Sequence, residues 1–387
     1  MRKKPILVLP FVFIFVIALI GSAPKAQAST WWNTGNLENA VHVYSLLYAN
    51  DGAIYAGTAS GDNPWDSVGV VFKTTDGGTT WTPTASLGGL GVVGNIETII
   101  QTTGGSIDNN IFIGTAWEGK IFKSSDGGAS WIQVVDLAGV AEIDTMIQAA
   151  NGDLYAGTHC VAPDEARIYR STDYGATWNV VAAPSIDGDL SGMTVIESMI
   201  QASTGYFYAT GFPGHVWRSD NGDTWVKVAD KSILGGAYKN YSLLETSNGY
   251  IYVATRSPGA VWRSTDNGNT WTQVADSTEL GGGVTRCDGL CQASNGTIYV
   301  GTDTGKIYRS IDGDSWILET NLVGASRVNP IIEAAPGYMY AGTSYEGDVF
   351  MVPIGAIGAV LMPLLMLLPF ALMLRRQNRR CYSAGGV

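Results

Sequence analysis

One short segment recurs along this chain and constrains its fold more than any other feature: Ser/Thr-x-Asp-x-Gly-x-Thr/Ser-Trp. Full copies occur at Thr74–Trp81, Ser124–Trp131, Ser171–Trp178 and Ser264–Trp271, and copies one residue shorter at Ser219–Trp225 and Ser310–Trp316. Each copy predicts a β-hairpin turn, because Asp or Asn accepts hydrogen bonds from turn amides and Gly adopts positive φ. The residues expected to hold these turns are Asp76, Asp126, Asp173, Asn221, Asp266 and Asp312.

Three short alternating strands are expected before each repeat turn. The third ends in a basic residue, as in Ile121-Phe122-Lys123, and the first is an apolar segment such as Thr145-Met146-Ile147-Gln148. The second carries a recurring aromatic residue, at Tyr55, Phe112, Tyr155, Tyr208, Tyr252, Tyr299 and Tyr340. Four-stranded units that repeat every 41–57 residues indicate propeller blades.

The repeat count predicts how the ring closes. There are seven pairs of inner strands but six repeat turns, and the last unit reaches an apolar segment before its fourth strand. Ser29-Thr30-Trp31 resembles the start of a fourth strand, so we expect residues 29–351 to form a seven-bladed, all-β propeller closed by an N-terminal strand within residues ~29–37. Such closure leaves no open sheet edge. The alternative is a six-bladed ring with a separate hairpin.

The repeated turn resembles the Asp box, or bacterial neuraminidase repeat, of sialidase-like β-propellers. That resemblance implies a propeller but not one function, because Asp-box proteins include sialidases, xyloglucan-cleaving endoglucanases, sortilin-type receptors and photosystem assembly factors. Sialidases place three arginines around the substrate, one of them early in the chain. Here Arg167 is the first arginine after Ser29, so the sialidase arginine triad is missing and sialidase activity is not expected.

Both ends of the chain are predicted to lie outside the propeller. Residues 1–28 read as a signal peptide, with a basic start, an apolar stretch and a small-residue cleavage site at Ala26-Gln27-Ala28. The uncharged residues 352–374 predict a C-terminal transmembrane helix, and the arginines in residues 375–387 predict a basic cytoplasmic tail. We therefore expect a single-pass cell-surface protein with its N-terminal domain outside. The alternatives are an uncleaved N-terminal anchor and a C-terminal sorting tail that is removed.

Charge and motif content limit the possible partners and cofactors. The net charge is −11 although both flanks are basic, so the domain between them is strongly acidic and not suited to nucleic acid. No phosphate loop or zinc-ligand spacing is present, and no cofactor is expected beyond a structural or channel-mouth cation. His159 and His215, near Cys160 and Asp164, are interpreted as structural rather than as metal ligands.

Three loops on the face opposite the repeat turns combine an aromatic residue with an acid. They are Asp62–Asp66 around Trp65, the pair Trp117 and Glu118, and the pair Tyr345 and Glu346. An exposed aromatic ring beside a carboxylate suits the faces and hydroxyls of a sugar. The alternative is ordinary hairpin chemistry, because Gly follows two of these acids.

Aligning the inner strands places one polar residue of each in a single column: Tyr44, Glu97, Asp144, Glu197, Tyr241, Asp288 and Asn329. In a propeller this column surrounds the mouth of the central channel. Four converging carboxylates raise one another's pKa values or attract a cation. We expect a polar site for a cation or a hydroxyl-rich ligand; alternatively, each acid only satisfies amides at the start of its strand.

These features predict a surface-anchored recognition or scaffold propeller that binds a glycan or a protein at its loop face. The alternative class is an extracellular glycoside hydrolase or lyase, which requires two carboxylates across a cleft.

Overall fold

The computed structural model describes residues 30–61, 68–84, 94–104, 109–160, 165–185, 190–334 and 337–354. Within these ranges the chain is all-β, and it contains no helix long and apolar enough to cross a membrane. The predicted signal peptide, the basic tail and residues 355–374 of the predicted transmembrane segment lie outside the described residues. Its first two residues, Val352 and Pro353, belong to the sheet.

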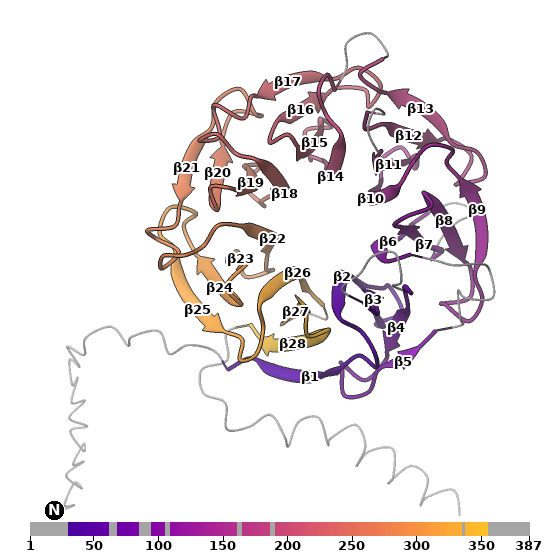
Figure 1. The fold of residues 1–387 in the computed structure, drawn as a ribbon, viewed down its shortest axis with the longest axis horizontal. Helices are drawn as coiled ribbons and strands as arrows, with labels where there is room; N and C mark the ends of the chain where they lie inside the picture. Colours follow the sequence, from indigo (N-terminus) through magenta and orange to yellow (C-terminus); the bar gives the residue numbers. More distant parts are fainter. Residues whose placement is uncertain are drawn as a thin grey trace, which may run out of the picture.

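The strands occupy four concentric positions around a central axis (Figure 1). The innermost are β2 (His42–Tyr48), β6 (Ile96–Gln101), β10 (Glu142–Gln148), β14 (Val195–Gln201), β18 (Lys239–Glu245), β22 (Cys287–Gln292) and β26 (Arg327–Glu333). The second are β3 (Ile54–Ala59), β7 (Ile111–Thr115), β11 (Leu154–His159), β15 (Phe207–Phe212), β19 (Ile251–Arg256), β23 (Ile298–Thr302) and β27 (Tyr338–Ser344).

The third and fourth positions complete each group outward. The third strands are β4 (Val71–Thr74), β8 (Lys120–Ser124), β12 (Ile168–Ser171), β16 (Val216–Ser219), β20 (Ala260–Ser264), β24 (Lys306–Ser310) and β28 (Asp348–Pro353). The outermost are β5 (Thr82–Pro83), β9 (Ile132–Asp136), β13 (Asn179–Ala182), β17 (Val226–Ala229), β21 (Thr272–Ala275), β25 (Ile317–Asn321) and β1 (Trp32–Asn36). Neighbouring positions pair antiparallel, which is the architecture of a β-propeller.

The outermost strand of the last group comes from the N-terminal end of the domain. Trp32 of β1 pairs with Met351 of β28, and Asn36 pairs with Asp348. Leu37, which follows β1, is fully buried in a cluster that combines Val43 of the first group with Val349 of the last. The pairing and the apolar cluster therefore join the two ends of the domain.

The recurring aromatic residues of the second strands connect neighbouring groups. The Tyr55 hydroxyl donates to the Gly127 carbonyl at 2.9 Å, and Tyr340 donates to Gly77 at 3.0 Å. Both carbonyls belong to the repeat turn of the next group. At Gly222 (φ 81°) a Cβ would lie 2.4 Å from the Tyr155 hydroxyl, so this close approach requires glycine.

A second set of contacts between groups involves the last side chain of the inner strands. Gln148 Oε1 accepts a hydrogen bond from the Thr103 N–H at 2.8 Å, and Gln201 accepts one from Ala150 at 2.7 Å. The equivalent pairs are Gln101 with Asn50, Glu245 with Ser203, Gln292 with Ser247 and Glu333 with Ser294. These contacts fix each inner strand relative to its neighbour, and so fix the residues at its other end.

The turn residues make dense local hydrogen bonds. Asp76 Oδ1 accepts from the Thr80 N–H at 2.9 Å and from the Thr74 hydroxyl at 2.8 Å, while Gly78 N–H donates to Thr74 Oγ1 at 2.9 Å. The other turn aspartates and Asn221 accept equivalent bonds. Hydrogen bonds from Ser130 and Ser124 lower the pKa of Asp126 to about 2.

Candidate functional site

A β-bulge at the start of the inner strands shapes the channel mouth. The register of each inner strand with its second strand shifts there, for example between Ile143 and Thr145. A bulge takes a residue out of the ladder and redirects its side chain. The residues at the bulges are Tyr44, Glu97, Asp144, Glu197 and Tyr241, and the wider irregularities of β22 and β26 contain Asp288 and Asn329.

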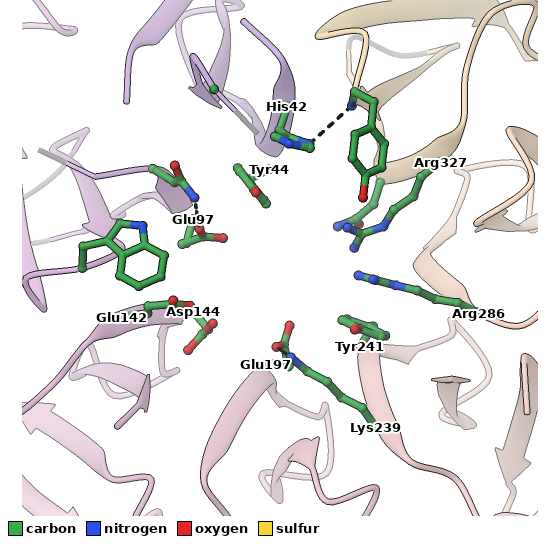
Figure 2. Close-up of a pocket in the computed structure, with 15 residues that line it drawn as sticks. His42, Tyr44, Glu97, Glu142, Asp144, Glu197, Lys239, Tyr241, Arg286 and Arg327 are labelled. Carbon is green, nitrogen blue, oxygen red and sulfur yellow. Dashed lines mark hydrogen bonds and ion pairs between the residues drawn. The ribbon is translucent and has the colours of Figure 1, made fainter. Parts of the chain in front are cut away.

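The redirected side chains enclose a cavity of about 450 Å³ at the channel mouth. Its lining residues are His42, Tyr44, Gly61, Asn95, Glu97, Trp117, Glu142, Asp144, Glu197, Lys239, Tyr241, Arg286, Arg327, Asn329 and Tyr345. Figure 2 shows the labelled carboxylates gathered on one side and the arginines on the other. We call Glu97, Glu142, Asp144 and Glu197 the acidic half, and Lys239, Arg286 and Arg327 the basic half.

The acidic half holds more negative charge than its surroundings compensate. Burial raises the pKa of Glu97 to about 8, and the neighbouring Glu142 adds to the rise. Burial also raises the pKa of Asp144 well above its ordinary value, with Glu142 and Glu197 contributing. Asn95 Nδ2 donates to Glu97 Oε1 at 3.1 Å, whereas the buried Asp144 Oδ2 accepts no hydrogen bond from the described residues. This half therefore favours a bound proton or a cationic group.

The basic half is organised around the buried carboxylate of Asp288. Arg327 contacts it through two hydrogen bonds, from Nε at 2.8 Å and from Nη2 at 2.9 Å, and the Nε of Arg286 donates to the same carboxylate. Two guanidinium groups thus share one carboxylate, which leaves one positive charge in excess. At the boundary between the halves, Lys239 forms an ion pair with Glu197.

Tyr241 supports the cations of the basic half. The Arg286 guanidinium lies 3.6 Å from the Tyr241 ring centroid, and Lys239 Nζ lies 5.0 Å from it. The ring face attracts cations. Burial lowers the pKa of Lys239, but Glu197 and other neighbours more than offset this and leave it above its ordinary value.

Aromatic residues complete the cavity opposite Tyr241. The ring centroids of His42 and Tyr345 are 4.9 Å apart, and the Tyr345 N–H donates to His42 Nδ1 at 3.3 Å (Figure 2). Burial, followed by Glu97, raises the pKa of Tyr44, so its phenol stays neutral and can donate a hydrogen bond. Trp117 (φ 73°) and Tyr345 (φ 77°) adopt left-handed backbone conformations that are costly for such side chains.

The structure brings most of the expected column together at the cavity, with one difference. Tyr44, Glu97, Asp144, Glu197 and Tyr241 line it, whereas Asp288 lies beneath the arginines and is 1 % exposed. Its carboxylate is covered because the preceding residue of the same face is Arg286, which folds back onto it. Asp288 therefore positions the basic half instead of facing a ligand.

In the described loops that combine an aromatic residue with an acid, the aromatic residues line the cavity and the acids do not. Trp117 and Tyr345 line the cavity, but Glu118 pairs with Lys120 and Glu346 accepts from the Ser326 hydroxyl at 2.7 Å. Both acids belong to hairpins whose glycine has positive φ, so they fit the alternative of hairpin chemistry. Trp65 lies outside the described residues.

The sequence interpretation missed a second column, two residues before the first. It consists of His42, Asn95, Glu142, Lys239, Arg286 and Arg327, all of which line the cavity. Residues at i and i − 2 of a strand face the same side, so this spacing was the signal that would have found them. The column supplies all three cations of the site.

The two histidines considered as metal ligands, His159 and His215, have separate partners. His159 Nδ1 lies 3.3 Å from a Glu142 carboxylate oxygen, and His215 Nδ1 accepts from the Lys231 N–H at 3.0 Å. Within the described ranges, no group of three or more His, Cys, Asp or Glu side chains is arranged to hold a metal ion.

Comparisons with known proteins identify the fold. No family model matches the chain, and no curated protein matches it. Similar solved structures are β-propellers. A structure of YCF48 bound to D1 peptide has a TM-score of 0.63 and 16 % identity, covering 87 % of this chain and all of YCF48. A virginiamycin B lyase from Staphylococcus aureus has a TM-score of 0.63 and 12 % identity, covering 84 % of this chain and 99 % of the lyase.

A GH74 xyloglucanase from Xanthomonas campestris is also similar, with a TM-score of 0.62 and 14 % identity over 86 % of this chain and 54 % of the enzyme. At these identities the likeness concerns the fold alone. It supports a propeller.

Proposed function

We propose that this protein is an exported, surface-anchored recognition propeller that binds a charged segment of a partner protein at its channel mouth. The main support for the proposal is the cavity of about 450 Å³, which is lined by acidic residues on one side and by basic residues on the other. A cavity of this size is sufficient for a few residues of a peptide. Neutral sugars need hydroxyl partners and an aromatic platform but no such separation of charge.

The architecture that we propose is a closed seven-bladed propeller of the Asp-box type. The four-strand groups, the β1–β28 pairing and the turn hydrogen bonds support this assignment. Export and anchoring rest on the sequence of residues 1–28 and 355–374. Protease treatment of intact cells should remove the domain if it is outside, and leave it intact if it is not.

Binding of a protein segment has support from one similar structure, that of YCF48 bound to D1 peptide. Glycoside hydrolysis is the second candidate, because Glu97 is a buried carboxyl whose raised pKa suits a general acid. A glycan ligand without turnover is a further outcome of the same test.

The test exposes the full chain, purified in a mild detergent, to a peptide array, a glycan array and a set of polysaccharides. We expect peptide binding without release of reducing ends, and weaker binding by Glu97→Gln than by Glu118→Gln, a control on the same face outside the cavity. Glycan binding without peptide binding would contradict the proposed partner class. Release of reducing ends that Glu97→Gln abolishes would instead establish a hydrolase.

A further inference from the structure

We propose that the cavity recognises a ligand with both an ammonium or guanidinium group and a carboxylate, the cation entering the acidic half and the carboxylate the basic half. This inference rests on the proposed function and narrows its ligand to a chemical class. A free amino acid, a peptide terminus or a peptide with neighbouring basic and acidic side chains fits that class.

The negative charge of the acidic half is only partly neutralised by neighbouring cations. Lys239 compensates Glu197 and His159 lies beside Glu142, but Glu97 and Asp144 have no ion-pair partner of their own among the described residues. Asp144 Oδ2 is buried and has no hydrogen-bond donor among the described residues. A buried acceptor without a donor is energetically unfavourable, and a donor on a ligand would satisfy it.

An organic cation fits the acidic half better than a metal ion. The described acidic and histidine side chains do not form a metal-ligand group. The carboxylates instead lie beside Tyr44, whose ring borders this half of the cavity (Figure 2). Carboxylate oxygens and an aromatic ring together are a common environment for ammonium and guanidinium groups.

The basic half retains donors for an anion. Asp288 receives the Nε of Arg286 and the Nε and Nη2 of Arg327. Within the described part of the chain, the other Nη groups of these two arginines make no hydrogen bond to protein. Figure 2 shows both guanidinium groups directed into the cavity, where a carboxylate can accept from both.

The two halves face each other across one cavity, so a single ligand that carries both charges satisfies both. A ligand with one charge leaves the other half as it is in the free protein. Ligands that differ only in the spacing between amine and carboxylate therefore measure the span of the site.

The experiment titrates the full chain in detergent with glycine, γ-aminobutyrate and ε-aminocaproate, using calorimetry and thermal shift. Each is compared with the amine and the carboxylate of the same length: methylamine and acetate, propylamine and butyrate, pentylamine and hexanoate. We expect at least one amino acid to bind about 10-fold tighter than its amine or carboxylate alone, because one added charged hydrogen bond is worth that factor.

Variants test which half of the cavity binds the cation of the ligand and which binds its carboxylate. Glu97→Gln, which keeps the side-chain shape, should reduce amino-acid affinity to that of the carboxylate alone. Arg327→Lys, which keeps the charge but removes the paired donors, should weaken it about 10-fold. The controls are Glu118→Gln and Arg218→Gln, because Arg218 contacts the Asn267 carbonyl at the repeat-turn face; neither should change affinity.

Three results would overturn the inference: an amine or Ca²⁺ that binds as tightly as the amino acid, equal binding by wild type and Glu97→Gln, or no binding by any amino acid while array peptides with only one of the two charges bind. If those singly charged peptides still require Glu97, the proposed function stands and only this ligand class is wrong. If no array peptide binds either, both are wrong.

Discussion

Leu37 offers a sharp test of how the ring is closed. Its side chain is fully buried between the first and last groups of strands, in the cluster with Val43, Phe72 and Val349. Leu234, which follows β17, is equally buried, and the turn after each leucine is the same: Ala40 N–H donates to the Leu37 carbonyl, and Ala237 N–H to that of Leu234. Leu234 is therefore a matched control within a continuous part of the chain.

The expected magnitude follows from burial. Leu→Ala at a fully buried site costs about 2–5 kcal/mol through lost transfer free energy and the cavity that remains. Because both leucines are 0 % exposed, Leu37→Ala and Leu234→Ala should destabilise the protein by about the same amount, within about 1 kcal/mol of each other. If the N-terminal strand did not close the ring, Leu37 would lie in a loose tail and its replacement would cost almost nothing.

The assay is urea denaturation followed by tryptophan fluorescence, supported by thermal unfolding. We expect both alanine variants to lower the midpoint of unfolding by similar amounts, and Leu37→Met to lower it much less because volume is conserved. A normal midpoint for Leu37→Ala together with a lowered one for Leu234→Ala would refute closure by β1. Deletion of Ser29–Asn36 provides an independent check and should also destabilise the domain.

Three further predictions concern the turns and the cavity. Asp76→Ala should lower the free energy of unfolding by about 1–2 kcal/mol through lost turn hydrogen bonds, without affecting ligand binding per folded molecule; a folded variant that has lost binding would contradict this. Because turn hydrogen bonds lower the pKa of Asp126, Asp173 and Asp312 to about 2, their stabilisation is present above pH ~4 and lost as pH falls to about 2, which acid unfolding curves measure. The raised pKa of Glu97, about 8, has the opposite effect on stability: the free energy of unfolding of the free protein should fall as pH rises from ~4.5 through about 8. Glu97→Gln should remove part of that fall. Identical pH profiles of stability for the wild type and Glu97→Gln would contradict the assignment.

Local chemistry made much of the fold predictable from sequence. The Asp-Gly turns and the aromatic residue of each second strand repeat because every group uses the same contacts, as the bonds of Tyr55 and Tyr340 to neighbouring turns illustrate. The fourth strand of the last group was predictable for the same reason. Ser29-Thr30-Trp31 resembles the start of the other outer strands, although the paired residues begin at Trp32.

The candidate site was predictable only in part. The column of Tyr44, Glu97, Asp144, Glu197 and Tyr241 was visible because one register aligned the inner strands. Sequence gave no sign that bulges turn this column toward the axis, since a bulge depends on backbone pairing. Nor did it indicate that Arg286 would cover Asp288, because that contact depends on two side chains folding toward each other.

We expect partners to bind at the channel mouth and not at the repeat turns. Two exposed tyrosines on opposite faces allow a direct test: Tyr345 at the cavity rim, 62 % exposed, and Tyr174 in a repeat turn, 46 % exposed. Each is replaced by a photo-crosslinking phenylalanine in the full chain, and adducts are measured in the cells that produce the protein. We expect an adduct from position 345 that Glu97→Gln diminishes, and none from position 174. Adducts from position 174 alone would contradict it.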